Sequence, residues 1–341
     1  MENIAQAPLT TLGIGGPARW FVEATSEAEI AEACAWARER GMPLFVLGGG
    51  SNVLVADAGF DGLVLHLALK GMELEGEVLR AAAGTPWEHC VQQATEAGLA
   101  GVECLAGIPG TVGGTPVQNV GAYGQEVSTV IERVRAFDRT AQEFVEFANA
   151  DCGFAYRKSR FNTTDKGRFV VMRVDYRLRR NGAPTLTYAE LKAHFSGQKE
   201  TPSLVEVAEA VRGIRQSKGM LLVEGDPDCR SAGSFFKNPS VAPAVAERVK
   251  QIAADAGVAV RMFPAEGGLV KIPAAWLIEQ AGFRKGYALG AAAISSRHTL
   301  ALVNRGGVTA AEILALAEKI RAAVEARFGI RLEMEPERVG F

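Results

Sequence analysis

The sequence predicts an α+β fold, and three observations carry that prediction. A capping box at Ser26 and Glu29 precedes a helical pattern that runs to about residue 40. A short apolar strand pattern over 43–47 follows and ends in a run of glycines. Strand patterns then dominate up to about residue 180, and helical patterns dominate after residue 204. Helices and strands in this order favour α/β lobes followed by a more helical region.

The individual elements follow from the same periodicities. Further strands are predicted at 64–67, 134–138 and 169–174. Further helices are predicted near 86–97, 204–216, 242–256, 273–281 and 309–328. The helix at 204–216 has an apolar stripe suited to burial, and the last helix begins with a second capping box, formed by Thr309 and Glu312.

Composition limits the class of protein. The 341 residues are 48% hydrophobic and 22% charged, which is ordinary for a globular protein of two or three domains. A formal net charge of −2 argues against general nucleic-acid binding. We expect no membrane span and no signal peptide, because no apolar run approaches about 20 residues and the N-terminus lacks the charged-then-apolar layout. Five scattered cysteines without a C-x-x-C motif indicate reduced thiols and a cytoplasmic protein, and the four histidines lack metal-ligand spacing.

The most informative segment is 107–124, in which six of eighteen residues are glycine. Glycine is costly in conformational entropy, so this density indicates sharp bends or close contact with a ligand. The small and hydroxylated residues between the glycines leave main-chain N–H groups available, and such donors suit an anion such as a pyrophosphate. The alternative is a long mobile loop, which the interspersed Ile, Val, Pro and Tyr residues disfavour.

A second glycine cluster, GGGSN at 48–52, follows the strand at 43–47. It offers backbone donors, a hydroxyl and an amide, although Gly-Gly turns also join strands where no ligand binds. Neither cluster matches the P-loop pattern or the G-x-G-x-x-G fingerprint of the Rossmann fold. Two glycine segments far apart in sequence therefore suggest a dinucleotide held by another fold.

Three short motifs could carry chemistry. The segment 231–239, SAGSFFKNP, places the hydroxyl of Ser234 beside two aromatic residues that exclude water, although a plain strand with a buried Phe pair explains it equally well. The segment 154–161, FAYRKSRF, interleaves cations and aromatics and could bind a carboxylate through an Arg. The segment 333–338 concentrates three glutamates, which by themselves would be expected to face solvent.

Together these motifs resemble the UDP-N-acetylenolpyruvoylglucosamine reductase family. Its members carry, in the same order, GGGSN, GIPGTVGGTPVQNVGAYG, YRKS, GSFFKNP and a C-terminal EPE. The resemblance extends over nearly the whole chain, from Thr11 to Glu337. GSFFKNP and the long glycine segment are its specific motifs, whereas GGGSN is shared with other flavoproteins.

The resemblance implies a fold and a division into domains. The expected fold is α+β, an FAD-binding fold of the vanillyl-alcohol-oxidase/PCMH type in two α/β lobes, with a C-terminal α+β substrate domain. The expected bounds are 1–70 for the first lobe, 71–200 for the second, 201–330 for the substrate domain and 331–341 for a tail that returns to the active site.

The resemblance also implies a reaction. Non-covalently bound FAD and the co-substrate NADPH would reduce UDP-N-acetylglucosamine-enolpyruvate to UDP-N-acetylmuramate in peptidoglycan precursor synthesis. The expected partner is this small-molecule substrate, with no nucleic acid, no membrane and no metal. We expect a monomer.

Site residues are carried over from the matching motifs. Ser234 would protonate the substrate carbon, and Arg157 and Glu337 would stabilise the intermediate. The substrate-binding residues would be Tyr188, which is characteristic of the longer subtype of the family, together with Lys218, Asn238 and Gln280. The cofactor-binding residues would be Gly48, Gly49, Gly50, Ser51, Asn52, Gly107, Ile108, Pro109, Gly110, Thr111, Gly113, Gly114, Gln118, Asn119, Gly121, Ala122, Tyr123 and Gly124.

Two departures from the family pattern leave alternatives open. The segment 219–230 is longer and more apolar than is usual before GSFFKNP, which bears on the role of Lys218. The usual tail is E-P-E-V-R, whereas here Glu337 precedes Arg338-Val339, so Glu335 is the alternative catalytic carboxylate. A rival function is that of a flavin oxidase of the same superfamily, although the glycine segments lack the histidine that many of those enzymes use to attach flavin. A catalytically silent nucleotide-sugar-binding protein is the other rival.

Overall fold

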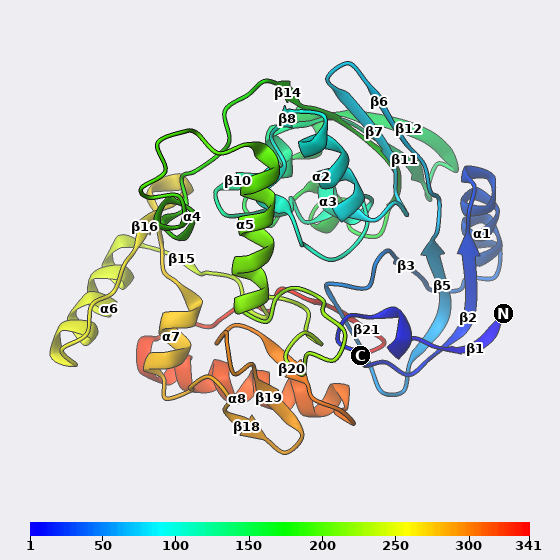
Figure 1. Ribbon diagram of the computed structural model, residues 1–341. Helices are drawn as coiled ribbons and strands as arrows, with labels where there is room; N and C mark the ends of the chain where they lie inside the picture. The colour runs from blue at the N-terminus through cyan, green and yellow to red at the C-terminus, as the bar shows by residue number, and fades with distance from the viewer. The chain divides into compact units, whose positions relative to one another are not determined.

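The computed structural model describes all 341 residues and contains a mixture of helices and strands (Figure 1). Contacts divide the chain into two compact units. Unit 1 comprises Met1–Ala5, Pro17–Gly50 and Phe60–Ser217. Unit 2 comprises Gln6–Gly16, Ser51–Gly59 and Lys218–Phe341. Two short N-terminal segments therefore belong with the C-terminal part of the chain.

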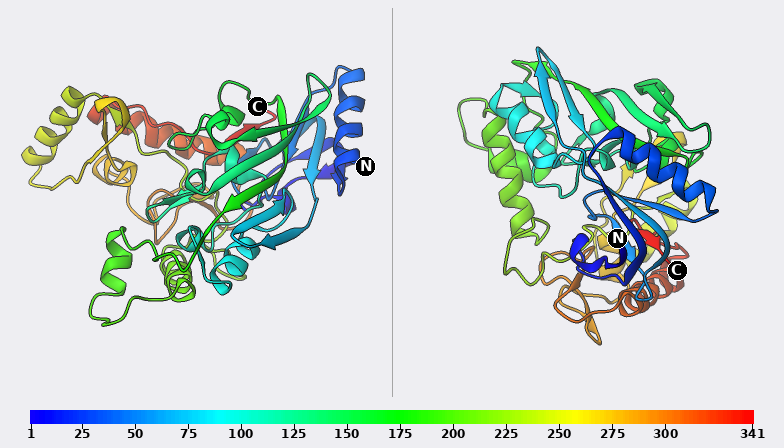
Figure 2. Two further views of the ribbon diagram at one scale, coloured as in Figure 1. Left: turned by 90° about the horizontal axis from the view of Figure 1, so that it is seen from above. Right: turned by 90° about the vertical axis from the view of Figure 1, so that its right-hand side faces the viewer.

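The first sheet of unit 1 has the order β1-β2-β5-β3. Its strands are β1 (Glu2–Ala5), β2 (Pro17–Ala24), β3 (Leu44–Leu47) and β5 (Phe60–Leu67). Strands β2 and β3 both pair with β5 in parallel, and β1 pairs with β2 antiparallel. Helix α1 (Glu27–Glu39) forms the predicted capping box and buries Ile30 and Cys34 against this sheet. The right-hand view of Figure 2 shows this helix, in blue, lying across the strands. This is the predicted α/β lobe.

The second sheet of unit 1 has the order β12-β11-β13-β7-β6 and is antiparallel throughout. Its strands are β6 (Met72–Glu75), β7 (Val78–Ala82), β11 (Ile131–Asp138), β12 (Glu143–Ala148) and β13 (Phe169–Arg177). Two short pairs accompany it: β9 (Gly121–Ala122) with β10 (Gln125–Glu126), and β8 (Leu99–Ala100) with β14 (Arg179–Arg180). The strands predicted at 134–138 and 169–174 are neighbours in this sheet.

Four helices complete the second part of unit 1: α2 (Trp87–Glu96), α3 (Gly114–Val117), α4 (Ala189–His194) and α5 (Leu204–Ser217). Helix α5 buries Val207 and Val211 in the core that α2 and the second sheet share. Its Arg212 Nε lies 2.5 Å from Glu88 of α2. The domain boundary expected near residue 200 precedes α5, whereas the compact unit continues to residue 217. The buried stripe of α5 explains why it packs there.

Unit 2 is built from short strands and three helices. Its strands are β4 (Val53–Val55), β15 (Ser240–Val241), β16 (Phe263–Pro264), β17 (Val270–Lys271), β18 (Ala288–Leu289), β19 (Ala292–Ile294), β20 (Leu302–Asn304) and β21 (Glu337–Val339). Its helices are α6 (Pro243–Asp255), α7 (Ala274–Gln280) and α8 (Ala310–Phe328). Helix α8 forms the predicted Thr309–Glu312 capping box and packs against β18 and β19 (Figure 1). The C-terminal strand β21 pairs in parallel with β4 from the N-terminal part of the chain.

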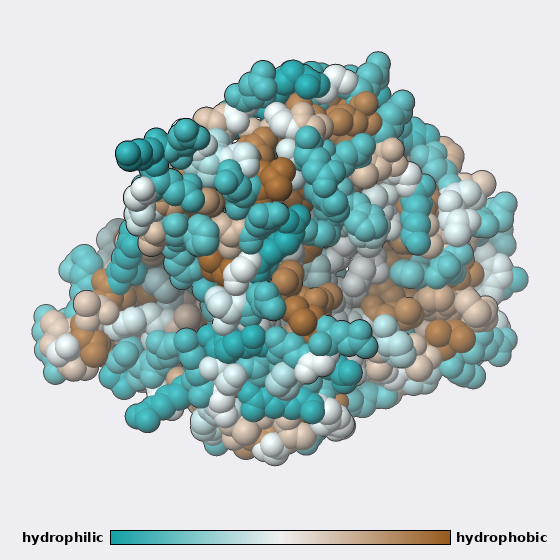
Figure 3. Space-filling model, viewed as in Figure 1, coloured by the Kyte–Doolittle hydropathy of each residue, from teal (hydrophilic) through white to brown (hydrophobic).

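All six predicted helices are confirmed, with shifts of at most one residue at their ends. None of the helices combines the length and the apolar composition needed to cross a bilayer. On the face seen in Figure 3 most of the surface is hydrophilic, and apolar residues form separate patches. Leu222, half exposed in the segment 219–230, is among the large apolar side chains that remain accessible.

Candidate active site

The two glycine segments meet inside unit 1. A Cβ atom on Gly49 would lie 2.6 Å from the Cα atom of Gly110, and a Cβ on Gly48 would lie 3.0 Å from Thr111 Oγ1. Only residues without side chains allow this approach of backbone to backbone. The second segment is also hydrogen-bonded to the start of helix α2, because Trp87 N donates to Gly110 O at 3.0 Å. The close contact explains why glycine occupies position 49, and the positive φ of 121° explains glycine at position 110.

The contact between the segments is rich in hydrogen-bond donors. The backbone N–H groups of Gly48, Gly49 and Gly50 donate to no backbone carbonyl. Thr111 Oγ1 is buried and has no hydrogen-bond partner within the protein. A buried hydroxyl without a partner is costly, and such groups usually mark a place where a ligand completes the hydrogen bonding. These donors, beside side-chain-free backbone, fit the pyrophosphate of a dinucleotide such as FAD.

The rest of the long glycine segment is packed, so the mobile-loop alternative is wrong. It forms the short helix α3 and strand β9, and Gly113 N donates to Ala83 O at 2.9 Å. A Cβ on Gly113 would lie 2.8 Å from Ala83 Cβ. Gly107 is held from both sides, because its N–H donates to Glu88 at 2.6 Å and its carbonyl accepts from Arg215 Nε at 2.9 Å. Of the other expected cofactor residues in this segment, the half-buried ones are Ile108, Pro109, Gln118 and Ala122, and the exposed ones are Gly114 and Gly124.

Arg157 lies against this segment in a strained backbone conformation. Its φ is 56°, and Asn119 and Tyr123 also adopt left-handed conformations, with φ of 43° and 48°. Arg157 Nη2 donates to Gly121 O at 2.7 Å, and Asn119 Nδ2 donates to Ala155 O at 3.0 Å. Strained non-glycine residues persist only where the surroundings hold them, and they cluster at functional sites. The guanidinium of Arg157 is therefore fixed beside the glycine segment.

A local capping motif explains why the chain turns at Arg157. Ser159 caps a single 3-10 turn (Arg160–Asn162), with a capping box to Asn162. The Ser159 hydroxyl also donates to Val117 O at 2.7 Å, and Asn162 Nδ2 donates back to Arg157 O at 3.2 Å. These bonds tie the YRKS motif to helix α3 of the glycine segment.

Tyr188 lies on the same part of unit 1. Its ring packs edge-on against the ring of Tyr123, with centroids 5.1 Å apart and planes at 83°. Tyr188 immediately precedes helix α4 and is 41% exposed, whereas Tyr123 is 9% exposed. Burial raises the pKa of Tyr123 to about 12, so this phenol stays protonated at neutral pH. An accessible ring braced by a buried one is suited to cover a ligand.

In unit 2, Ser234 belongs to an extended segment held along both edges. The next residue, Phe235, donates its N–H to Leu300 O at 2.8 Å and accepts from Glu335 N at 2.9 Å. Lys237 N donates to Glu333 O at 2.9 Å. The two phenylalanines after Ser234 are each 1% exposed, so they anchor the segment in the core while the Ser234 side chain stays half-buried. The buried Phe pair and the Ser234 hydroxyl therefore belong to the same extended segment, so the structural interpretation of this motif and the chemical one are compatible.

The C-terminal glutamates lie beside this segment. Glu337 begins strand β21, and its N–H donates to Asn52 O at 2.9 Å. Asn52 Nδ2 donates to Glu335 O at 3.3 Å, and Ser51 O accepts from Thr11 Oγ1 at 3.4 Å. The end of GGGSN, the GSFFKNP motif and the EPE tail are therefore neighbours in unit 2. Both Glu335 and Glu337 remain candidates for the catalytic carboxylate.

The remaining expected residues lie at the ends of helices. Asn238 Oδ1 accepts from Ala274 N at 2.8 Å, so its side chain satisfies the first turn of helix α7. Gln280 is the last residue of the same helix and is half-buried. Lys218 begins the C-terminal segment of unit 2, directly after helix α5, and is half-buried.

Sequence patterns missed several residues of this region. Thr11 Oγ1 donates to Ser231 O at 2.7 Å and so joins the N-terminal TTLGIGG segment to the start of the GSFFKNP motif. Asp228 is a buried carboxylate in the segment 219–230. No periodicity signals either contact, although the glycines after Thr11 and the acidic pair at 226 and 228 mark unusual segments. No group of three or more His, Cys, Asp or Glu side chains is placed to hold a metal ion.

Comparison with known proteins agrees with this arrangement. Residues 18–144 match the family "FAD binding domain", and residues 226–339 match "UDP-N-acetylenolpyruvoylglucosamine reductase, C-terminal domain". The chain is 48% identical over its whole length to the UDP-N-acetylenolpyruvoylglucosamine reductase of Streptomyces coelicolor, covering 90% of that protein. It is 45% identical over 99% of its length to that of Thermobifida fusca, covering 98%.

A solved structure extends the agreement to three dimensions. The crystal structure of the same-named reductase from Thermus caldophilus superposes with a TM-score of 0.70 at 27% sequence identity, covering 99% of this chain and 98% of that one. The alternative of a flavin oxidase is not favoured, since eight relatives that match the chain over 96–100% of its length at 42–48% identity are named as the reductase. The chain belongs to the UDP-N-acetylenolpyruvoylglucosamine reductase family.

Proposed function

We propose that this protein reduces UDP-N-acetylglucosamine-enolpyruvate to UDP-N-acetylmuramate, with FAD as bound cofactor and NADPH as hydride donor. The observation that carries the proposal is the contact between the two glycine segments, where the Thr111 hydroxyl has no partner and the N–H groups of 48–50 donate to no backbone carbonyl. Arg157 and Tyr188 contact the second of these segments further along, at Gly121 and Tyr123. Full-length similarity to the reductase family supports the choice of substrate. Bound FAD, held by the two glycine segments, would supply the hydride transfer from NADPH to the enolpyruvyl carbon.

In this proposal the two glycine segments bind the cofactor through their backbone. The N–H groups of 48–50 and the hydroxyl of Thr111 would bind the pyrophosphate, while the turns of 107–124 would contact the rest of the dinucleotide. Ser51 and Asn52 complete the expected set. The absence of side chains at Gly49 and Gly110 supports this role, because a methyl group at Gly49 would already collide with the neighbouring segment.

Arg157 would stabilise the negative charge that develops on the substrate during reduction. A planar guanidinium suits a carboxylate, because it can donate two parallel hydrogen bonds. Its bond to Gly121 O and its strained backbone support a pre-organised role, since a donor that is already oriented needs no rearrangement in the transition state.

Ser234 would supply the proton that completes the reaction. Its neighbours Phe235 and Phe236 are buried and hold the segment in the core, which supports a precise place for the hydroxyl. A well-placed general acid typically accelerates a reaction about 10²–10⁴-fold. Glu337, or else Glu335, would be the catalytic carboxylate, which stabilises the intermediate together with Arg157.

Four further residues would bind the sugar nucleotide. Tyr188 would cover it, Lys218 would bind its diphosphate, and Asn238 and Gln280 would contact the nucleotide portion. The exposed ring of Tyr188 supports a covering role.

We further propose a monomer of the cytoplasm without nucleic-acid partners. Its two FAD-binding lobes are residues 1–70 and 71–200, its substrate domain is 201–330 and its tail is 331–341. The five free cysteines support a reducing compartment.

The test separates the two half-reactions by the absorbance of the flavin near 450 nm. The purified protein is reduced anaerobically with NADPH, and UDP-N-acetylglucosamine-enolpyruvate is then added. We expect bleaching followed by return of colour in the wild type and in the control Ser240→Ala, whose serine is exposed. In Ser234→Ala, bleaching should stay near normal while the return of colour slows by about 10²–10⁴-fold.

Each other outcome contradicts a different part of the proposal. A protein that binds no FAD would refute the cofactor. Bleaching without return of colour in the wild type would refute the substrate. An equal loss of both half-reactions in Ser234→Ala would refute the role of Ser234 as proton donor.

A further inference from the structure

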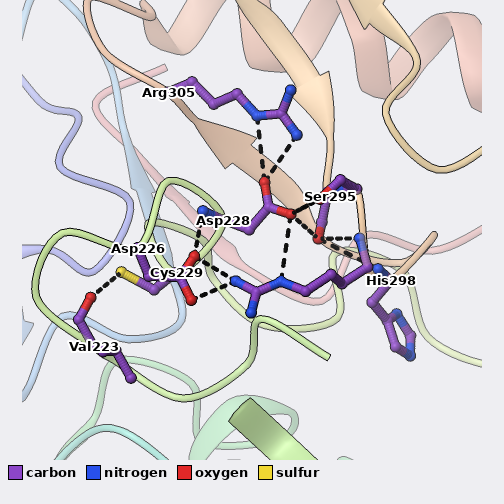
Figure 4. Close-up of polar contacts among 9 residues, drawn as sticks. Val223, Asp226, Asp228, Cys229, Ser295, His298 and Arg305 are labelled. Carbon is purple, nitrogen blue, oxygen red and sulfur yellow. Dashed lines mark hydrogen bonds and ion pairs between the residues drawn. The ribbon is translucent and has the colours of Figure 1, made fainter. Parts of the chain in front are cut away.

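A buried carboxylate organises the segment that precedes the GSFFKNP motif. Asp228 is 1% exposed, and its two oxygens accept hydrogen bonds from four groups. Figure 4 shows Asp228 between Arg305 and Ser295. Ser295 Oγ donates at 3.0 Å, and Ser296 donates through its N–H at 2.8 Å and through its hydroxyl at 2.5 Å. The guanidinium of Arg305 donates to the other oxygen, at 2.9 and 3.3 Å.

A second carboxylate of the segment 219–230, Asp226, belongs to the same cluster. Asp226 accepts hydrogen bonds from Arg297 with both of its oxygens, and Arg297 Nε lies 3.7 Å from Asp228 Oδ2. Burial alone would raise the pKa of Asp228, but the hydrogen bonds from Ser296, Arg305 and Ser295 together hold that pKa below its usual value. Asp228 is therefore an anion at neutral pH, compensated by two cations.

The cluster reaches the other end of the segment, beside Lys218. Gly219 follows Lys218 directly and has φ of +66°. A Cβ atom on Gly219 would lie 3.1 Å from Asp228 Cβ and 3.1 Å from Arg297 Nε and Nη2. The backbone of Gly219 thus packs directly on the Asp228–Arg297 pair, so the two ends of the segment 219–230 are held at one place.

The partners of Asp228 also hold the residues around Ser234. Ser295 and Ser296 lie in the turn between β19 and β20, and Arg305 directly follows β20. The same hairpin binds the motif, because Asn304 N donates to Arg230 O at 2.9 Å and Leu300 O accepts from Phe235 N at 2.8 Å. A carboxylate bonded to both ends of this hairpin fixes the distance between the hairpin and the segment that leads to Ser234.

We propose that Asp228 is a positioning residue for the reaction: by binding Ser295, Ser296 and Arg305, it holds the segment 219–230 and the β19–β20 hairpin together so that Ser234 and Lys218 keep their places. This inference rests on the proposed function, in which Ser234 donates a proton and Lys218 binds the diphosphate. Asp228 itself acts only through these neighbours. The segment 219–230 is longer than is usual in the family, and in this proposal Asp228 is the residue that holds it in place.

The test replaces the carboxylate by an amide of the same shape. In Asp228→Asn, the amide NH₂ would face Arg305 or the serine hydroxyls, and Arg305 would lose its counter-charge, whereas Arg297 would keep Asp226. A displacement of about 1 Å at a reacting group can cost about 100-fold in rate. We expect the return of colour with the enolpyruvyl substrate to slow by about 10- to 100-fold, while bleaching by NADPH and flavin content stay close to wild type.

A matched control separates positioning from loss of stability. Asp138 in unit 1 is also a buried carboxylate, 2% exposed, bound by one arginine, Arg168, and by the N–H groups of Thr140 and Ala141. Asp138→Asn removes a similar ion pair, whose partners all belong to unit 1. We expect it to lower stability without a selective effect on the return of colour.

A milder variant decides the question if Asp228→Asn does not fold. Ser296 is exposed, and Ser296→Ala removes only one hydrogen bond to Asp228. It should slow the return of colour in the same selective way, by a smaller factor than Asp228→Asn. The inference is wrong if these variants change the two half-reactions equally, or if they leave the return of colour as fast as in Asp138→Asn. Failure of the wild type to regain colour would instead refute the proposed function, and the inference with it.

Discussion

Gly49→Ala tests directly whether the two glycine segments form the cofactor site. The added Cβ would lie 2.6 Å from Gly110 Cα, 2.9 Å from Gly110 C and 3.1 Å from Thr111 N. All three neighbours are backbone atoms, which cannot rotate away as a side chain would. Ordinary contact begins at 3.4 Å, so the two segments must separate by about 0.8 Å at their closest point.

The cost follows from overpacking in a close-packed region. Inserting a methyl group that forces backbone shifts typically costs about 1–3 kcal/mol. If the separation also displaces the N–H groups that bind the pyrophosphate, the same free energy is lost from binding. This corresponds to an increase of about 5- to 150-fold in the Kd for FAD.

The assay is FAD titration of the flavin-free protein, with urea unfolding of the same samples. Gly213→Ala is the control, because Gly213 is exposed in helix α5 and its Cβ would meet nothing within 4 Å. That variant should be stabilised by about 0.5–1 kcal/mol and should bind FAD normally. If Gly49→Ala bound FAD as tightly as the wild type, the glycine contact would not form the binding site.

Two further predictions concern stability and thiol chemistry. The hydrogen bond from Arg168 holds the pKa of Asp138 below its usual value, so the stability that this carboxylate contributes is present at neutral pH and is lost as the pH falls below about 4. Asp138→Asn should therefore lower the urea midpoint at pH 7, and its deficit relative to the wild type should shrink below about pH 4; a deficit that is constant across this range would contradict the assignment. Burial raises the pKa of the Cys34 thiol to about 11 and the pKa of the other three buried thiols to about 12. Only the half-buried Cys229 should react quickly with Ellman's reagent at neutral pH, and five thiols should react after unfolding; rapid reaction of several thiols in the folded protein would show that the core is more open than described.

Local sequence determined the secondary structure and the identity of the family. Each capping box, at Ser26 and at Thr309, involves residues only three positions apart, and the apolar stripe of 204–216 lies within one helix. The interactions that define these helices are therefore made by near neighbours in the sequence. The glycine segments and GSFFKNP are likewise contiguous. For that reason, their residue types alone indicated a dinucleotide and the reductase family.

Tertiary structure decided which of these segments meet. Gly49 and Gly110 are in contact although about sixty residues separate them, and Asp228 finds its partners in the turn at 295–296 and at Arg305. The left-handed backbone of Arg157 depends on the capping turn and on Gly121. Residues 51–59 join unit 2 through pairing of β4 with β21, and residues 6–16 join it through hydrogen bonds such as that from Thr11 Oγ1 to Ser231 O. Such contacts depend on packing, loop closure and hydrogen bonding across the whole chain, and these energies leave no periodic trace in the sequence.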